Sequence, residues 1–263
     1  MRVSIIIPAY NEERRILPML RRYGEYFEDL RKKRELNYEF LVVINNTTDN
    51  TLSVVKNGQK TKPRIHYLDL KLGGKGLAII AGFKDALKRP NDLIGFADAD
   101  MATPPEAFYD LVRSVNRCDG VIAARWRRES VITRQTSLFR VKSFIFNLIV
   151  RSLFLFPYRD TQCGAKLFTR RAIEHVHDKM SITKWAFDID LLYKLRKLGF
   201  AVIERPTIWE SKEDSRIRLV TASVEMFLAV IRLRLVHSPM AFIVRTYDAL
   251  PQQLKMHHRI WIQ

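Results

Sequence analysis

The sequence of 263 residues has few cysteines and comparatively few acidic residues. Its two cysteines, Cys118 and Cys163, do not amount to a disulfide framework, which argues against a small secreted scaffold and favours a reducing, cytosolic-facing environment. Only 28 Asp and Glu stand against 45 Lys and Arg, so the formal net charge is +17. Such an excess favours a polyanionic partner, which is a nucleic acid, an anionic membrane surface or a phosphorylated substrate.

No apolar run in the sequence is long enough for a convincing membrane-spanning helix. The longest apolar stretches, residues 138–156 and 219–244, are interrupted by charged residues, whereas a spanning helix needs about 20 mostly apolar residues. The first residues lack the basic region and the small-residue cleavage site of a signal peptide. We therefore expect the two stretches to form buried or interfacial helices.

Strand-like and helix-like segments alternate along the first half of the chain. Apolar runs typical of strands lie at residues 3–7, 39–44, 65–68, 93–97 and 120–124. Stretches with helical spacing lie between them, at residues 11–33, from 51 onward, 77–87 and 104–115. This alternation predicts an α/β fold with an open, mostly parallel sheet flanked by helices. There is no linker, repeat or low-complexity tract.

Polar side chains cluster where the predicted strands end. Parallel sheets bind ligands at the carboxyl ends of their strands, so these clusters are expected to converge on one edge of the sheet. They are residues 10–12, 45–49, 73–76, 98–100 and Arg125.

Asp98 and Asp100 are the most informative of these residues. They follow the apolar run 93–97, and strand alternation predicts that both side chains lie on the same side of the sheet. Mg²⁺ and Mn²⁺ take oxygen ligands and usually bind one or two carboxylates together with substrate phosphates. The pair is therefore a candidate metal–diphosphate site, although an Asp-x-Asp triplet also occurs in ordinary surface turns.

A glycine-rich turn at residues 73–76 contains Lys75 and precedes a predicted helix. Backbone N–H groups and a lysine in such a turn are suited to a phosphate. The spacing does not fit the phosphate-binding loop of nucleoside triphosphatases, which excludes that class. An ordinary glycine-rich turn remains the alternative.

The second half of the chain is basic, with eleven Lys and Arg against two acidic residues between positions 125 and 171. Asp160 is either a catalytic carboxylate, the partner of a basic side chain or a turn residue. Asp188 and Asp190 lie among aromatic residues, where an acid tends to have a perturbed pKa, although Asp is also common at helix starts. Arg234 interrupts an apolar helical face, which fits either a membrane-interface helix with snorkelling basic residues or a core-packed helix.

With these residues assembled, the chain resembles GT-A glycosyltransferases of the polyprenyl-phosphate type, closest to the dolichyl-phosphate β-glucosyltransferases and related to dolichol-phosphate mannose synthase. The resemblance rests on residues 4–13, on Asp98–Thr103, on DTQCGAKLFTR at 160–170 and on WAFDIDLL at 185–192. It implies a Rossmann-like GT-A fold, with a catalytic domain over residues 1–217. It also implies amphipathic membrane-proximal helices in the second half, with residues 218–263 as a membrane-interface segment.

The resemblance implies a role for individual residues. Pro8, Tyr10 and Glu12 would hold the base and ribose, Lys75 and Arg125 would approach the diphosphate, and Asp98 and Asp100 would hold the nucleotide and a Mg²⁺ or Mn²⁺ ion. The implied site is, for substrate binding, Pro8, Tyr10, Glu12, Asn45, Lys75, Asp98, Ser215 and Arg216; for catalysis, Asp100, Asp160, Asp188 and Arg125; and for the metal, Asp98 and Asp100.

One departure concerns the donor. Members of the family usually carry Asp-Asp-Gly-Ser where this chain has Ile44-Asn45-Asn46-Thr47. The missing carboxylates bear on recognition of the base, because an asparagine amide offers a hydrogen-bond donor as well as an acceptor.

The resemblance implies inverting, metal-dependent transfer of a hexose from a nucleotide sugar to a polyprenyl or dolichyl phosphate, with glucose and UDP-glucose favoured. The enzyme would be peripheral or monotopic on the cytoplasmic face of a membrane, with any anchoring partner unknown. Two alternatives remain: a mannosyltransferase that uses GDP-mannose, and a basic nucleic-acid-binding protein. The second rests on the net charge alone, and we expect no nucleic-acid partner.

Overall fold

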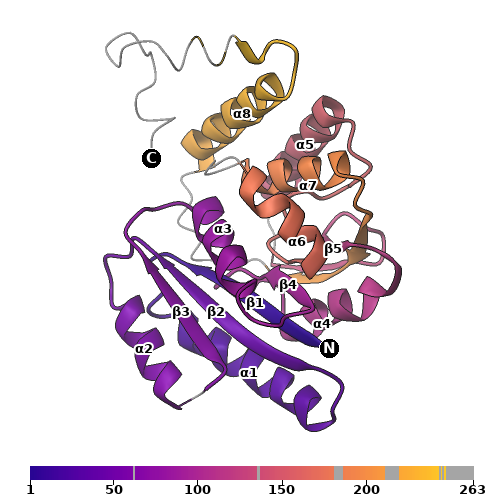
Figure 1. Ribbon diagram of the computed structural model, residues 1–263. Coiled ribbons are helices and arrows are strands. Elements are labelled where there is room, and N and C mark those ends of the chain that lie inside the picture. Colours follow the sequence, from indigo (N-terminus) through magenta and orange to yellow (C-terminus); the bar gives the residue numbers. More distant parts are fainter. Residues whose placement is uncertain are drawn as a thin grey trace.

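The computed structural model describes residues 1–61, 63–134, 137–180, 186–210, 219–242, 244 and 246 (Figure 1). The strands are β1 (Arg2–Ala9), β2 (Asn37–Asn45), β3 (Ile65–Leu70), β4 (Leu93–Phe96), β5 (Gly120–Ala124), β6 (Val131–Thr133), β7 (Lys166–Thr169), β8 (Val202–Pro206) and β9 (Ile208–Glu210). The α-helices are α1 (Ile16–Lys32), α2 (Thr51–Thr61), α3 (Lys75–Ala86), α4 (Pro105–Ser114), α5 (Ser137–Phe154), α6 (Arg170–Val176), α7 (Phe187–Lys197) and α8 (Leu219–Val236). Two 3-10 turns follow α4 and α6, at Val115–Arg117 and His177–Lys179.

Seven strands form one sheet in the order β3-β2-β1-β4-β7-β5-β8. All neighbouring pairs run parallel except those made by β7, which is antiparallel to both β4 and β5. β6 and β9 pair separately as a short parallel ribbon. The predicted α/β fold with a mostly parallel sheet is confirmed, and the five strands expected in the first half are all present.

Helices cover both faces of the sheet, with α1, α2 and α4 on one side and α3, α6 and α7 on the other (Figure 1). The strands are apolar on both faces for this reason. In β1, Ile5 and Ile7 pack under α1 and α4, whereas Ile6 faces α3. Burial of both faces makes the sheet a rigid base for the loops at its carboxyl edge.

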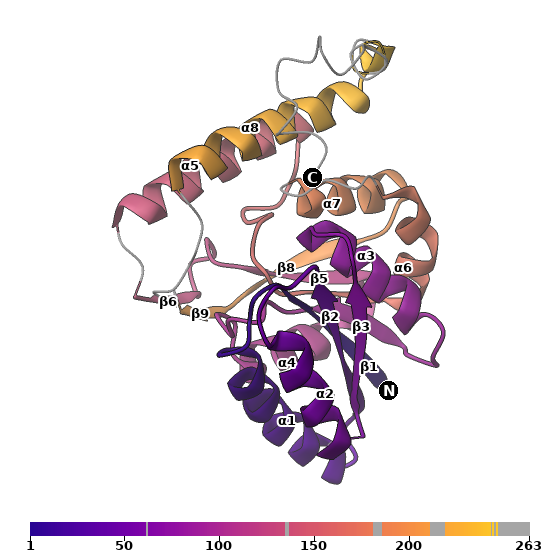
Figure 2. The same cartoon turned by 90° about the vertical axis from the view of Figure 1, so that its left-hand side faces the viewer.

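α5 and α8 lie side by side and project beyond the sheet (Figure 2). Val150 and Phe154 of α5 share a buried cluster with Val230 and Leu233 of α8. Arg234 Nε donates a hydrogen bond to the carbonyl of Leu153 at 2.8 Å. Arg234 therefore joins the two helices, which matches the core-packed interpretation better than a snorkelling side chain.

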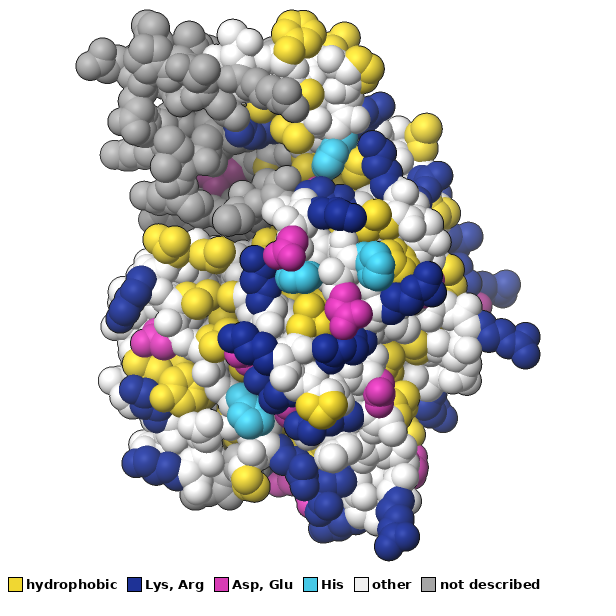
Figure 3. All heavy atoms as spheres, in the orientation of Figure 1, with side chains coloured by type: hydrophobic (Ala, Val, Ile, Leu, Met, Phe, Trp, Pro, Cys, Tyr) yellow, Lys and Arg dark blue, Asp and Glu magenta, His cyan; other side chains and the backbone are white. Residues whose placement is uncertain are grey.

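Within the part of the chain that the structure describes, no helix is both long and apolar enough to cross a membrane. On the face seen in Figure 3, Lys and Arg side chains are spread among acidic and apolar ones. The net charge of +17 is therefore not gathered into a single patch on that face.

Candidate active site

Asp98 and Asp100 lie in a turn beyond β4 and not in the strand itself. β4 ends at Phe96, the N–H of Met101 donates to the carbonyl of Asp98 at 3.3 Å, and Met101 has a left-handed φ of 57°. The prediction that strand alternation brings the two carboxylates to one side is therefore wrong. A tight turn brings them together, and the N–H of Ala102 fixes Asp100 by donating to its Oδ1 at 2.9 Å.

Lys75 neutralises one of these carboxylates. Its Nζ lies 2.5 Å from Asp98 Oδ1, and both side chains are about one-third exposed, at 37% and 34%. Lys75 is the first residue of α3 and follows Gly74, whose φ of 137° requires glycine. Partial burial lowers the pKa of Lys75, but the negative charges of Asp98 and Asp188 outweigh it and raise that pKa overall.

Asp100 carries the second carboxylate of the turn. Burial and the neighbouring charge of Asp98 both raise the pKa of Asp100 above its ordinary value. A desolvated carboxylate beside another carboxylate is stabilised by a divalent cation. The residues therefore fit a Mg²⁺ or Mn²⁺ ion held by two carboxylates, with substrate oxygens completing the coordination.

No group of three or more His, Cys, Asp or Glu side chains that fits a metal occurs among the described residues. A preformed structural metal site of that kind is therefore absent from this part of the chain. The pair at Asp98 and Asp100 is consistent with a metal that binds together with its substrate.

The loop before β7 packs directly on Asp98. A Cβ added to Gly164 would lie 1.9 Å from Asp98 Oδ2, closer than any real Cβ contact. Gly164 is therefore required for the close approach of the loop backbone to the carboxylate. The motif at residues 160–170 thus reaches the same site as Asp98, although the sequence separates them by more than sixty residues.

Asp160 holds Arg125 at the end of β5. The carboxylate accepts hydrogen bonds from Arg125 Nε at 2.7 Å, from Arg125 Nη2 at 3.0 Å and from the Arg125 backbone N–H at 2.9 Å. Burial raises the pKa of the Asp160 carboxyl, but Arg125 outweighs it and lowers that pKa. Asp160 is fully buried and already paired, so its geometry suits a residue that orients Arg125.

A second buried ion pair joins Lys166 of β7 to Asp188 of α7. Lys166 Nζ lies 2.6 Å from Asp188 Oδ1 and donates to the carbonyl of Cys163 at 2.6 Å. The Lys166 side chain is completely buried and lies over the Phe96 ring. The pair therefore anchors the loop that carries Gly164, and Asp188 is its counter-ion.

The loops after β1 and β2 are joined by side-chain hydrogen bonds. Asn11 Oδ1 accepts from the hydroxyl of Thr47 at 2.9 Å and from the N–H of Thr48 at 2.8 Å. Asn11 has a left-handed φ of 54°, and α1 begins at Ile16, later than the predicted residue 11. Tyr10 projects from this edge and is 54% exposed.

The remaining predicted residues of this edge have definite positions. Pro8 is half-buried within β1. Glu12 forms an ion pair with Arg15 at 2.6 Å. Asn45 ends β2 and is buried, and its Oδ1 accepts from the N–H of Gly74 at 2.7 Å. Ser215 and Arg216 lie outside the described residues, as does Trp185.

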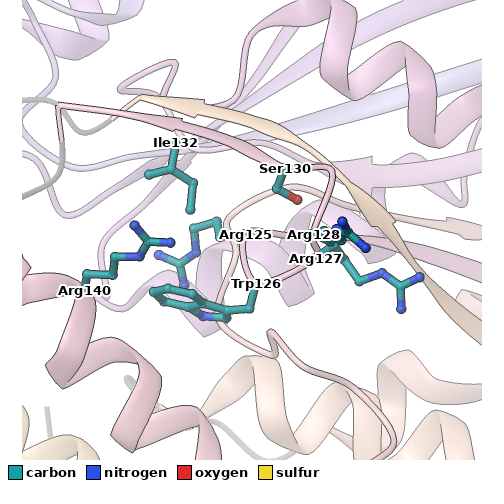
Figure 4. A pocket seen from close by; sticks show the side chains of 7 residues that line it. All are labelled: Arg125, Trp126, Arg127, Arg128, Ser130, Ile132 and Arg140. Carbon is teal, nitrogen blue, oxygen red and sulfur yellow. The ribbon is translucent and has the colours of Figure 1, made fainter.

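A basic hollow of about 360 Å³ lies beside Arg125 (Figure 4). The residues that line it are Arg125, Trp126, Arg127, Arg128, Ser130, Ile132 and Arg140. Arg125 and Arg140 both lie about 6.0 Å from the Trp126 ring centre, and Figure 4 shows the two guanidinium groups converging beside the indole. In the described part of the chain, Arg127, Arg128 and Arg140 form no ion pair with a carboxylate. The hollow is therefore suited to an anionic group.

Sequence reasoning did not single out several residues that hold the site together. Asn147 of α5 is buried, and its Oδ1 accepts from the N–H of Thr161 at 3.0 Å. Glu204 of β8 accepts from the N–H groups of Arg159 and Asp160 at 2.6 and 2.8 Å. A polar residue within the otherwise apolar run 144–150 was the available signal for Asn147. Glu204 had no comparable signal.

A scan against family models matches residues 4–176 to the model described as glycosyl transferase family 2. The chain belongs to glycosyl transferase family 2. This family 2 enzyme is therefore a glycosyltransferase. It is 33% identical over 229 residues to a human dolichyl-phosphate beta-glucosyltransferase, covering 82% of this chain and 69% of that protein. It is 30% identical over 239 residues to a Trichomonas vaginalis protein of the same description, covering 88% and 70%.

The family 2 enzyme also has the expected GT-A fold. It is similar to glucosyl-3-phosphoglycerate synthase from Mycobacterium tuberculosis, solved with Mn²⁺, uridine diphosphate and glucosyl-3-phosphoglycerate, with a TM-score of 0.66 at 16% identity. The match covers 89% of this chain and 79% of that one. At this identity the likeness establishes the fold alone.

Proposed function

We propose that this glycosyltransferase transfers glucose from UDP-glucose to a polyprenyl or dolichyl phosphate at the cytoplasmic face of a membrane. The proposal rests on one observation: two regions that each suit a phosphate lie next to each other. The turn at Asp98 and Asp100 suits a metal-bound diphosphate, and the arginine-lined hollow suits a second anion. Arg125 belongs to both regions, because it lines the hollow and its pKa responds to the charge of Asp98.

The relatives support the identity of the substrates. Two proteins described as dolichyl-phosphate beta-glucosyltransferases match most of this chain at 30 to 33% identity. A sugar donor and a lipid phosphate are each phosphate compounds, which agrees with two neighbouring regions, of which one suits a metal-bound diphosphate and the other an anion. The nucleic-acid alternative had only the net charge in its favour.

The reaction joins an oxygen of the acceptor phosphate to the anomeric carbon of the sugar. The bond between that carbon and the diphosphate breaks, and its electron pair leaves with the nucleoside diphosphate. In-line attack inverts the anomeric centre. A Mg²⁺ or Mn²⁺ ion held by Asp98 and Asp100 would neutralise charge on the leaving diphosphate, while Lys75 and Arg125 add fixed positive charge.

The proposed acceptor needs no strong general base. A phosphate monoester has a second pKa of about 6, so it is already largely anionic at neutral pH. The two candidate carboxylate bases, Asp160 and Asp188, are each committed to a buried cation. Their proposed roles are to orient Arg125 and to hold Lys166.

The outer face of α5 supports attachment to a membrane surface. Its large exposed side chains fall on one helical stripe, with each between 50 and 54% exposed: Val141, Phe144, Ile145 and Leu148. Trp126 of the hollow contacts Phe144 edge to face at 6.1 Å between ring centres. The apolar stripe therefore begins beside the proposed phosphate site, as required when the phosphate is the head of a membrane lipid.

A transfer assay tests the proposal. The enzyme is incubated with radiolabelled UDP-glucose or GDP-mannose, Mn²⁺ and a polyprenyl phosphate in detergent micelles. We expect label from UDP-glucose in an organic-extractable, acid-labile product whose formation requires both metal and lipid phosphate. Transfer from GDP-mannose alone would overturn the glucosyl assignment, and hydrolysis without lipid product would overturn the acceptor.

A further inference from the structure

The amide of Asn45 at the end of β2 has a fixed orientation. The N–H of Gly74 donates to its Oδ1 at 2.7 Å, so the oxygen faces Gly74 and the Nδ2 group occupies the other end. Asn45 Nδ2 donates to no group of the described residues, and it is not one of the buried polar atoms cut off from solvent. Although the Asn45 side chain is mostly buried, its Nδ2 group is thus a hydrogen-bond donor that solvent still reaches.

Asn45 lies next to the place where a donor diphosphate would bind. Gly74, which holds its oxygen, directly precedes Lys75, and Lys75 pairs with Asp98. The opposite side of Asp98 is occupied by Gly164 and, further on, by Arg125 and the arginine-lined hollow. A nucleotide whose diphosphate reaches Lys75 therefore has its nucleoside over the ends of β1 and β2, where Tyr10 offers an exposed ring.

The loop after β2 offers that nucleoside no uncommitted carboxylate. Its one acid, Asp49, accepts from the hydroxyl of Thr51 and from the N–H groups of Glu13 and Thr51. The residue before Asn45 is the fully buried Ile44. The group that the end of β2 leaves without a partner among the described residues is accordingly an amide N–H.

We propose that Asn45 reads a carbonyl oxygen of the donor base, so that the enzyme discriminates little between uridine and cytidine diphosphates; this inference rests on the proposed function. Uracil presents N3–H between two carbonyls, whereas cytosine presents a bare N3 and the O2 carbonyl. A carboxylate at position 45 would accept from uracil N3–H and repel the cytosine N3 lone pair. The Nδ2 donor of Asn45 instead matches the O2 carbonyl that both bases share.

A substitution that replaces the amide nitrogen of Asn45 by a carboxylate oxygen tests the proposal. In Asn45→Asp, one carboxylate oxygen can keep the bond from Gly74 N–H while the other replaces Nδ2 with an acceptor. Calorimetric titration with UDP and with CDP, each with Mn²⁺, gives the ratio of their dissociation constants. We expect a ratio within about 3-fold for the native enzyme. We expect a preference for UDP of about 10-fold or more for Asn45→Asp, because a hydrogen bond to a charged group contributes about 1.5–3 kcal/mol.

Asn46→Asp is the matched control. Asn46 is exposed and adjacent, so the substitution adds the same charge without touching the Gly74 contact, and we expect the UDP-to-CDP ratio to remain as in the native enzyme. A native preference for UDP above about 10-fold, or an unchanged ratio in Asn45→Asp, would overturn the proposal, since hydrogen-bond readout predicts a change of that size. A shift in Asn46→Asp alone would assign the readout to Asn46 and would overturn it as well.

The outcomes separate this inference from the proposed function. If UDP binds and glucose is transferred but the ratio favours UDP strongly, only the role of Asn45 fails. If neither UDP nor CDP binds to the folded enzyme in the presence of Mn²⁺, the proposed donor fails and takes this inference with it. Tighter binding of GDP than of both pyrimidine nucleotides would do the same.

Discussion

The active site has two parts that differ in the sign of their uncompensated charge. The first part is built on the ends of strands β1 to β4, and the second on β5, β7 and α5. In the first part, two carboxylates, Asp98 and Asp100, face one ammonium group, Lys75. In the second, Asp160 and Asp188 are each matched by a cation. Around the hollow, Arg127, Arg128 and Arg140 have no carboxylate partner among the described residues. We therefore propose a divalent cation for the first part and a phosphate for the second.

The two parts also differ in burial. The Lys75–Asp98 pair is about one-third exposed, at 37% and 34%, whereas Arg125–Asp160 and Lys166–Asp188 are nearly or fully buried. An exposed pair exchanges partners readily, while a buried pair is costly to break. We infer that the buried pairs provide a fixed frame and that the exposed pair rearranges when substrate binds.

Removal of one member of a buried pair should have the largest effect. Lys166→Met leaves Asp188 as a buried, unpaired charge, which we expect to lower the free energy of unfolding by about 3–5 kcal/mol. Chemical denaturation of the native enzyme and the variant measures this loss in the free energy of unfolding. Lys88→Met is the control, because Lys88 is exposed and its partner Asp85 keeps an ion pair with Arg89, and we expect a change within about 1 kcal/mol. Equal losses in both variants would contradict the difference in burial.

The contact of Gly164 with Asp98 should be next in size. Gly164→Ala forces the Asp98 carboxylate out of place, and we expect donor turnover to fall by about 100-fold, since displacement of a site residue by about 1 Å can cost that much. The control is Gly58→Ala, where an added Cβ meets nothing within 4 Å. Manganese binding followed by electron paramagnetic resonance should weaken in Gly164→Ala only. Unchanged manganese affinity would show that the loop does not position Asp98.

The apolar stripe of α5 should contribute a smaller, separable effect. Phe144→Glu places a charge on the stripe, and we expect binding to phosphatidylserine-containing vesicles to fall by about 10-fold, because burial of such a side chain contributes about 1.5–3 kcal/mol. Leu17→Glu on α1 changes an exposed leucine distant in sequence from the stripe and should leave vesicle binding unchanged. Similar losses in both variants would argue against a specific membrane-facing surface.

The smallest effect concerns Glu204, which supports Asp160 from β8. Burial raises the pKa of Glu204, so its ionised form opposes folding, and this cost disappears as the pH falls through the folded-state pKa. Glu204→Gln can retain an oxygen for the two N–H donors. We expect the free energy of unfolding of Glu204→Gln to exceed that of the native enzyme by most at pH 7. This difference should shrink toward pH 4, as measured by urea denaturation. A difference that grows toward low pH would contradict the assigned shift.

Local patterns in the sequence were sufficient for the five strands of the first half, but they did not identify β7 and β8, which complete the seven-stranded sheet. The apolar runs at Ile5–Ile7 and Leu93–Phe96 predict buried strands, because a strand buried on both faces is continuously apolar and does not alternate with polar residues. The convergence of polar clusters also followed from parallel topology, since strand ends meet at one edge. The predicted arrangement of Asp98 and Asp100 failed because β4 stops at Phe96 and a turn takes over.

Contacts between distant segments were beyond local patterns. Asp160 was identified as a possible partner of a basic residue, but only the packing of its loop against β5 selects Arg125. Gly164 has no left-handed φ, so nothing in its own backbone marks it. Its importance arises from the distance to Asp98, which is set by tertiary packing.

The central claim is that the two oppositely charged parts of the site bind two different phosphates. Steady-state kinetics with UDP-glucose and a polyprenyl phosphate test it directly in Arg140→Gln. We expect KM for the lipid phosphate to rise by about 10-fold, because a hydrogen bond to a charged group is lost, with KM for UDP-glucose unchanged. An equal rise in both constants, or a rise for UDP-glucose alone, would contradict the assignment of the arginine-lined hollow to the acceptor.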